Sequence, residues 1–488
     1  MKLQQAMNCA PLINYLQVVE REFSGLRTAP QSPSLLDDPK FRQIFLSSIA
    51  DLENSHEFAE LSKHTLKEFN KDKSFASIWQ HHITTFFRWS GLYEGIFEGA
   101  SINPEGICSL YAKEITAESG QWVCLAPIEL VEFPEQPLKF GDFAIQNFTA
   151  EELNVLLKQR TCKLFYPWAE VDTSTLSQFW MIVCTEERPI SHSGLLLWGE
   201  KIKPKYSPFS GKLKNAFRIL SLYKWRDQYS PDENLLLSDD AGLLSLNICP
   251  SLPFTIQIPQ GFLDNPPAAP DLSDLPMEAT MDSFGEEVGE HPYVAFDLSG
   301  SETEFRDFVK DINALVEKIK QVPQWQFIDV ALSFMEKGFR DSGLEQLLWH
   351  ITAIEALVGE DVPGLTNLLR DRVSFVLAKN PAERKKIKKI FEKLYDLRSD
   401  YMHGNEQLLD TKVVHHDLAQ AREMARQTTL WMLSYLNHVL AASTKNQTPL
   451  PSRDTLLSLL DLNEQSRIET ANLLSCLPNE FPLVFQSK

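Results

Sequence analysis

The chain has 488 residues, of which 43% are hydrophobic and 23% charged, and its formal net charge is −19 at pH 7. This length exceeds what one hydrophobic core usually supports, so two or three domains are expected. The negative charge excludes a protein that coats nucleic acid over its whole surface, and any contact with RNA must be local.

The cysteines and the apolar stretches of the sequence indicate the cellular compartment in which the protein is expected. The seven cysteines are scattered without a C-x-x-C pair, so neither a zinc site nor a disulfide framework is expected. They are typical of buried thiols in a reducing environment. The start, Met1 to Gln5, lacks the regions of a signal peptide, and no apolar stretch is long enough to span a bilayer. We expect a cytoplasmic protein without a membrane contact, a metal or a cofactor.

The first 260 residues divide into two parts that differ in their predicted secondary structure. Residues 1–98 carry apolar residues at mixed helical spacing and form a predicted helical N-terminal region. Residues 99–260 contain short β-rich runs, such as Phe140–Ile145 and Phe179–Val183, between Gly and Pro residues. Thr149–Glu152 is a capping-box pattern and predicts a helix from about Glu151. We expect a mixed, β-rich domain here.

Residues 261–301 form a predicted acidic, proline-containing linker. From Gly261 to Phe305 there are eleven acidic residues, five prolines and no Lys or Arg. Such a composition buries little apolar surface, so at least the first half is expected to be solvated. This segment is the clearest domain boundary that the sequence offers.

The C-terminal part is predicted to be all helix. Residues 302–445 show repeated helical periodicity with short connections, which favours an antiparallel bundle. Residues 446–488 form a tail with one more predicted helix, Thr455–Leu474. The fold class is thus α+β and multidomain. The helices expected in the bundle are Glu304–Ile319, Gln324–Phe339, Gly343–Val358, Leu365–Ala378, Pro381–Met402 and Thr411–Leu440.

The helix expected at Pro381–Met402 has marked ends. Asn380 is suited to the N-cap, Pro381 to the first position and Glu383 to the third. Gly404-Asn405 provides the stop. These limits allow each residue to be placed by angle at about 100° per residue.

Arg398 is the anomalous residue of this helix. It falls in the middle of a predicted apolar arc, where an arginine must find an anion or open onto a cleft. Glu355, on the helix Gly343–Val358, is expected either to reach Arg398 as a counter-ion or to lie partly exposed. The arc is made of Ile387, Phe391, Leu394, Tyr401 and Met402.

His403 follows Arg398 by five residues. On a straight helix this separation is a rotation of about 140°, so the two side chains share a face only if the last turn frays. The alternative is a symmetric pair of helices in which each protomer completes the pocket of the other. The sequence leaves both arrangements open.

Arginine and histidine together suit RNA cleavage without a metal. Neutral imidazole can take the proton of an attacking 2′-hydroxyl and later protonate the leaving 5′-oxygen. Guanidinium can stabilise the charge that develops on the phosphoryl oxygens. Ser399 or Asp400 is positioned in sequence to orient the pair, and Tyr401 to stack on a base.

The same region is locally basic. From Arg370 to Arg398 there are ten Lys or Arg and four acidic residues. The face opposite the apolar arc can hold phosphates, although a solvated helix face is the simpler explanation of any lysine run. The candidate RNA-binding residues are Arg384, Lys385, Lys386, Lys389 and Lys393.

With Arg398-Ser399-Asp400-Tyr401-Met402-His403-Gly404 in place, residues 302–442 resemble the HEPN superfamily, whose ribonucleases carry an R-x4–6-H motif on a helical bundle. The setting is most similar to the ApeA-like branch. The motif is the only Arg-x4–6-His in the chain, and it ends a capped helix. The supporting segments are Ile354–Leu357, Leu369–Phe375 and Leu394–Ser399.

The resemblance implies a metal-independent endoribonuclease that acts as a homodimer or higher homo-oligomer with a composite site. It further implies a toxin in bacterial anti-phage abortive infection, with tRNA anticodon loops as substrate. The N-terminal region is then expected to restrain the nuclease until a phage protein triggers it.

Two other functions fit the same residues. The bundle is alternatively a non-catalytic module that binds RNA, a nucleotide or a partner protein, with Arg398 as an anion anchor. The third alternative is a purely structural bundle, in which replacement of Arg398 only lowers stability. Loss of cleavage with retained RNA affinity in His403→Ala distinguishes the first function from the second.

Overall fold

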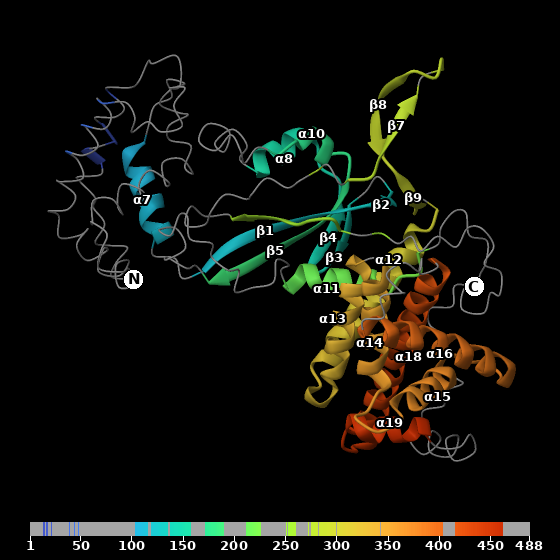
Figure 1. The fold of residues 1–488 in the computed structure, drawn as a ribbon. Coiled ribbons are helices and arrows are strands. Elements are labelled where there is room, and N and C mark those ends of the chain that lie inside the picture. Colours follow the sequence, from blue (N-terminus) through green and yellow to red (C-terminus); the bar gives the residue numbers. More distant parts are fainter. Residues whose placement is uncertain are drawn as a thin grey trace. The chain divides into compact units, whose positions relative to one another are not determined.

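The structure is a computed structural model of the chain, shown in Figure 1. Its description covers residues 103–115, 119–134, 137–157, 171–189, 211–225, 252–259, 275–281, 283–298, 300–341, 343–403 and 415–461, with isolated positions elsewhere. The predicted helical region 1–98 lies almost entirely outside the described residues, as does the stop signal Gly404-Asn405.

The chain divides into two compact units, each made of separate segments. One unit combines Met1–Pro127, Asn147–Lys212 and Phe254–Asp274, and the other Ile128–Gln146, Leu213–Pro253 and Leu275–Lys488. We call them the sheet unit and the helical unit. The sequence predicted domains that follow one another along the chain, whereas these units interleave.

In the sheet unit, three strands are neighbours in the order β5 (Trp180–Pro189), β1 (Ser119–Ile128) and β6 (Ile256–Pro259). Strands β1 and β6 are antiparallel, with Cys124 opposite Gln257. Their apolar residues pack with those of α8 (Ala150–Leu156) and α10 (Thr173–Leu176) into one core. This unit also contains α7 (Pro104–Ile115).

The capping box predicted at the start of α8 is present. The backbone N–H of Glu152 donates to the Thr149 hydroxyl at 3.2 Å, and the Thr149 N–H donates to the Glu152 carboxylate at 2.9 Å. The first β-rich run, Phe140–Ile145, is a hairpin in the helical unit, because β3 (Leu138–Phe140) turns at Gly141 into β4 (Phe143–Gln146). The second run lies at the start of β5.

The second half of the predicted linker is not linker. It contains β7 (Met277–Met281), β8 (Glu287–Pro292) and β9 (Val294–Asp297). Strand β9 pairs in parallel with β2 (Leu130–Glu132), which brings Phe296 into the core. Composition alone misses β9 because it is stabilised by pairing with a distant segment, whereas β7 and β8 pair with each other as a hairpin.

The helical unit contains the helices that the sequence predicted. Helices α14 and α16 have the predicted bounds, and α12, α13 and α15 differ from them by one to three residues. Helix α18 extends beyond the predicted end at Leu440, and residues 411–414 lie outside the described part. The bounds are α11 (Gly211–Leu220, in this unit from Leu213), α12 (Glu302–Lys320), α13 (Phe327–Arg340), α14 (Gly343–Val358), α15 (Leu365–Leu377), α16 (Pro381–Met402), α18 (His415–Asn446) and α19 (Arg453–Asp461).

Helix α14 is central in this unit. It contacts α13, α15, α16 and α18 (Figure 1), and eight of its residues are buried. The imidazole ring of His350 in α14 packs against Gly338 of α13. A Cβ atom added to Gly338 would lie 2.7 Å from this ring. A helix surrounded by other helices must be apolar on nearly every side, which explains its high content of Leu, Ile and Ala.

Two arginines secure the C-terminal end of α14. Arg372 of α15 is buried and donates to Val358 O at 2.7 Å, to Glu360 at 3.0 Å and to both carboxylate oxygens of Asp461 in α19. Arg453 of α19 donates to Ala356 O at 3.1 Å and to the carbonyl oxygen of Gly359. Cations at helix C-termini satisfy carbonyls that have no partner within the helix.

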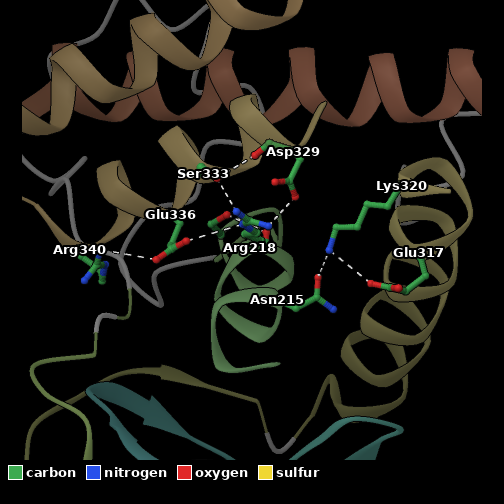
Figure 2. A network of polar contacts seen from close by, with 9 residues as sticks. Asn215, Arg218, Glu317, Lys320, Asp329, Ser333, Glu336 and Arg340 are labelled. Carbon is green, nitrogen blue, oxygen red and sulfur yellow. Dashed lines mark hydrogen bonds and ion pairs between the residues drawn. The ribbon is translucent and has the colours of Figure 1, made fainter. Parts of the chain in front are cut away.

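A polar network joins α11 to α13 (Figure 2). Arg218 donates to Asp329 at 2.7 Å and to Ser333, and it lies 3.7 Å from Glu336. Burial raises the pKa of Glu336, and the charges of Arg340 and Arg218 oppose that rise. Each buried charge of the network has partners of opposite sign, because Arg218 contacts Asp329 and Glu336, and Glu336 also contacts Arg340.

Candidate functional site

Helix α16 forms between the signals that the sequence carries. The Asn380 side chain accepts a hydrogen bond from the Glu383 N–H at 3.0 Å, and Pro381 holds the first helical position. The Glu383 carboxylate in turn accepts from the Lys379 N–H at 2.8 Å. The helix then continues without a break to Met402, where His403 is the C-cap.

The predicted apolar arc of α16 is correct except at its end. Ile387, Phe391 and Leu394 are buried in the bundle. Tyr401 is half-buried, but Met402 is 54% exposed and does not belong to the packed face. The last turn of α16 is thus only partly covered, with Asp400 and Met402 exposed and Ser399 and Tyr401 half-buried.

Arg398 lies where the packed face of α16 reaches the surface. Its Nη2 donates to Glu355 Oε2 of α14 at 3.3 Å, which is the counter-ion arrangement that the sequence offered as one alternative. The guanidinium also lies over the Tyr395 ring, with 5.6 Å between the guanidinium carbon and the ring centroid. The two charged side chains are 22% and 18% exposed, so the pair is accessible from one side.

One donor of Arg398 remains unsatisfied. The Nε atom is buried and has no hydrogen-bond partner among the described residues. The buried Nε is out of reach of a ligand, but a partly exposed guanidinium that is held by one carboxylate can bind a second anion, such as a phosphate, through its terminal nitrogens. This property distinguishes Arg398 from Arg372, whose donors are taken up by two carboxylates and a carbonyl.

Tyr395 is part of this cluster, although the sequence assigned it no role. Burial raises the pKa of Tyr395, and the charge of Glu355 and a hydrogen bond to it raise it further. Glu355 is therefore shared between a phenol and a guanidinium. The signal was present in the sequence, because residues three apart on a helix are neighbours, as Tyr395 and Arg398 are.

His403 is exposed at the open end of the same helix. Its backbone N–H donates to Ser399 O at 3.0 Å, so the last turn is intact rather than frayed. On this regular helix Arg398 and His403 point about 140° apart. The last turn of α16 is therefore not frayed, and the arrangement in which two subunits complete the site stays a prediction.

The other supporting residues are not joined to the pair. Ser399 and Tyr401 are half-buried and Asp400 is exposed. In the described part of the chain, no hydrogen bond or ion pair connects their side chains to Arg398 or His403. Their roles in orienting and stacking stay predictions.

The predicted RNA-binding residues separate into two groups. Lys385, Lys386 and Lys389 are exposed on α16. Lys393 forms an ion pair of 2.6 Å with the buried Asp417 of α18. Arg384 is half-buried and its guanidinium lies over the Phe375 ring at 5.5 Å. Lys393 is exposed too, but it is tied to Asp417, so Lys385 and Lys389 are the exposed lysines of α16 best placed to meet phosphates.

Within the described residues, no group of three or more His, Cys, Asp or Glu side chains is arranged to hold a metal ion. None of the described helices is both long and apolar enough to cross a bilayer. No family model matches the chain, and comparisons with curated proteins and with solved structures gave no match either.

Proposed function

We propose that the chain is a metal-independent endoribonuclease whose site combines Arg398 and His403, and that residues 302–445 form a HEPN-type bundle. The observation that carries this proposal is the partly exposed guanidinium of Arg398. It is oriented by Glu355 and Tyr395 and followed, at the open end of the same helix, by an exposed histidine.

The reaction needs only the groups that these residues supply. The imidazole of His403 takes the proton of a 2′-hydroxyl, whose oxygen attacks the adjacent phosphorus. Arg398 stabilises the charge on the phosphoryl oxygens, and the protonated imidazole returns a proton to the 5′-oxygen that leaves. The products are a 2′,3′-cyclic phosphate and a 5′-hydroxyl.

Two subunits together form the site in this proposal. Because α16 is regular to Met402, Arg398 and His403 of one chain diverge by about 140°. A two-fold axis near the end of α16 brings Arg398 of one protomer to the histidine of the other. The exposed helix end, with Met402 uncovered, provides the surface for this contact.

The proposed substrate is RNA in single-stranded loops, tRNA anticodon loops included, because such backbones reach in-line geometry and their bases can be splayed. Lys385, Lys386 and Lys389 would hold its phosphates. The proposed biological role is that of a toxin in anti-phage defence, restrained by the N-terminal region until infection supplies a trigger.

The proposal is tested by inducing the wild-type chain and His403→Ala in bacteria, with and without phage, and mapping RNA ends that carry 2′,3′-cyclic phosphate. We expect new ends at one class of loop with the wild type and none with His403→Ala. Asn446→Ala, at an exposed position at the end of α18, is the matched control and should cut like the wild type. An unchanged set of ends in His403→Ala would refute the proposal.

The alternative of a non-catalytic RNA-binding module gives a different result. It predicts no new ends with any variant, while RNA binding by the purified chain depends on Arg398 and the exposed lysines. A gel-shift titration of wild type, Arg398→Ala and Lys385→Glu/Lys389→Glu then measures the affinity directly.

A further inference from the structure

The hairpin formed by β7 and β8 is built as an isolated pair of strands. Its register runs from Met277 opposite Pro292 to Met281 opposite Glu287, and Gly285 turns it with φ of +80°. In the described part of the chain, neither strand pairs with a third strand. Two-stranded hairpins are marginally stable in water without a packed face.

The end of this hairpin exposes large apolar side chains. Phe284 is 89% exposed, Val288 64% and Met281 58%. We call these three residues the apolar tip; Figure 1 shows β7 and β8 as an arm at the top of the view. Apolar side chains gathered in this way on a surface mark a contact site.

The charge of the hairpin limits what can contact it. Residues 277–292 contain five acidic residues and no Lys or Arg, and Glu278, Glu286, Glu287 and Glu290 are exposed. Two such hairpins repel each other, and nucleic acid or an acidic membrane would be repelled as well. Of the remaining surfaces, a basic one matches the charge of the hairpin best.

A basic surface of this kind is present on α16. Five of the six residues from Arg384 to Lys389 are Lys or Arg, and Lys385, Lys386 and Lys389 are exposed. Their ammonium groups can pair with the carboxylates of the hairpin, and a lysine can lie over the exposed ring of Phe284. Their aliphatic stems offer apolar surface to the tip.

We propose that the acidic hairpin of one copy of the chain docks on the exposed lysines of α16 in a second copy. The contact joins two different surfaces, and two reciprocal contacts of this kind close a two-fold dimer. Because opposite charges form the contact, its strength falls as salt rises. The contact lies outside the Arg398 and His403 pair. Association that the hairpin variant leaves unchanged would therefore refute the hairpin contact alone, whereas a monomeric wild type would contradict the two-subunit site as well.

Sedimentation velocity of the full chain, over a range of concentrations and salt, measures this association. We expect the wild type to self-associate. Glu286→Lys/Glu287→Lys and Lys385→Glu/Lys389→Glu should each raise the dissociation constant about ten-fold or more. Phe284→Ser should weaken the contact too. A mixture of the two charge variants should associate again, because the reversed charges complement each other.

The control reverses two exposed acids of α12 outside the hairpin, Glu304→Lys/Asp307→Lys, and should associate like the wild type. Thermal melting followed by circular dichroism shows that each variant is folded, as expected for exposed positions. Any of three results would overturn the proposal. The wild-type chain could stay monomeric, the hairpin variant could associate as the wild type does, or the mixture of charge variants could fail to associate.

Discussion

Among the described residues, Arg398 combines a single carboxylate partner, an aromatic neighbour and a buried donor without a hydrogen bond. Replacement of its counter-ion by Glu355→Gln should lower the free energy of unfolding by about 1–3 kcal/mol, because the guanidinium then keeps its desolvation but loses its charge pair. Urea unfolding measures this loss. Glu304→Gln, at an exposed acid of α12, should change the stability little. Equal effects of the two variants would contradict this description of the pair.

The buried imidazole of His350 makes a second prediction at the residue scale. Burial, with a smaller contribution from the charge of Arg422, lowers the pKa of His350 to about 3. The unfolded chain therefore binds the proton more readily below pH 6.5. The stability that the neutral ring contributes is complete above pH 6.5 and is lost as the pH falls toward 3.

His350→Leu removes this dependence. Between about pH 4 and 6, the difference in unfolding free energy between wild type and variant should fall by roughly 1.4 kcal/mol per pH unit as the pH is lowered. Denaturant unfolding at several pH values measures the difference. A difference that does not vary with pH in this range would show that His350 is not held neutral by the fold.

Single residues show where reasoning from sequence succeeds and where it stops. The helical angle placed Arg398 on the packed face and offered Glu355 as a partner, which is the pairing in the structure. The same angle placed Met402 on that face, yet it is exposed. Periodicity gives the direction of a side chain but not the point at which neighbouring helices end.

At the scale of elements, the N-cap of α16 is a local device whose loss can be measured. Asn380→Ala removes the side chain that accepts from Glu383 N–H and should cost about 1 kcal/mol. Asn380→Ser keeps an accepting oxygen without placing a second carboxylate against Glu383 and should retain most of the stability. Chemical denaturation of the two variants side by side checks this, and an equal loss in both would contradict the capping role.

The arginine that joins three helical segments is a long-range device. Arg372→Met should lower stability by about 3 kcal/mol, because Asp461 and Glu360 lose their buried partner. Hydrogen exchange followed by mass spectrometry should show the greatest loss of protection in α19. Uniform loss over the whole chain would indicate that Arg372 does not secure that helix in particular.

The N-cap of α16 and the contacts of Arg372 differ in how far the sequence predicts them. The cap, the first-position proline and the acidic third position lie within four residues, so the bounds of α16 could be predicted. Arg372 contacts a residue 89 positions away, and no local pattern distinguishes it from an exposed helix arginine. Strand β9 of the predicted linker was missed for the same reason, since it pairs with the distant β2.

At the scale of the whole molecule, the sequence predicted domains that each occupy one continuous stretch of the chain. Each of the two compact units instead consists of three stretches, and those of the two units alternate along the sequence. Changes in amino-acid composition along a chain show where one kind of secondary structure gives way to another, but they do not show which segments pack together. The helical bundle, being local, was predicted nearly complete.

The central claim, that Arg398 and His403 of two subunits form one ribonuclease site, is tested most directly by mixing variants. Arg398→Ala, His403→Ala and an equal mixture of them, refolded together, are assayed on a single-stranded loop RNA. Each variant alone should be inactive. The mixture should recover about a quarter of wild-type activity, since half of the dimers are mixed and each has one intact site. Full cleavage by either variant alone, or none by the mixture, would contradict the claim.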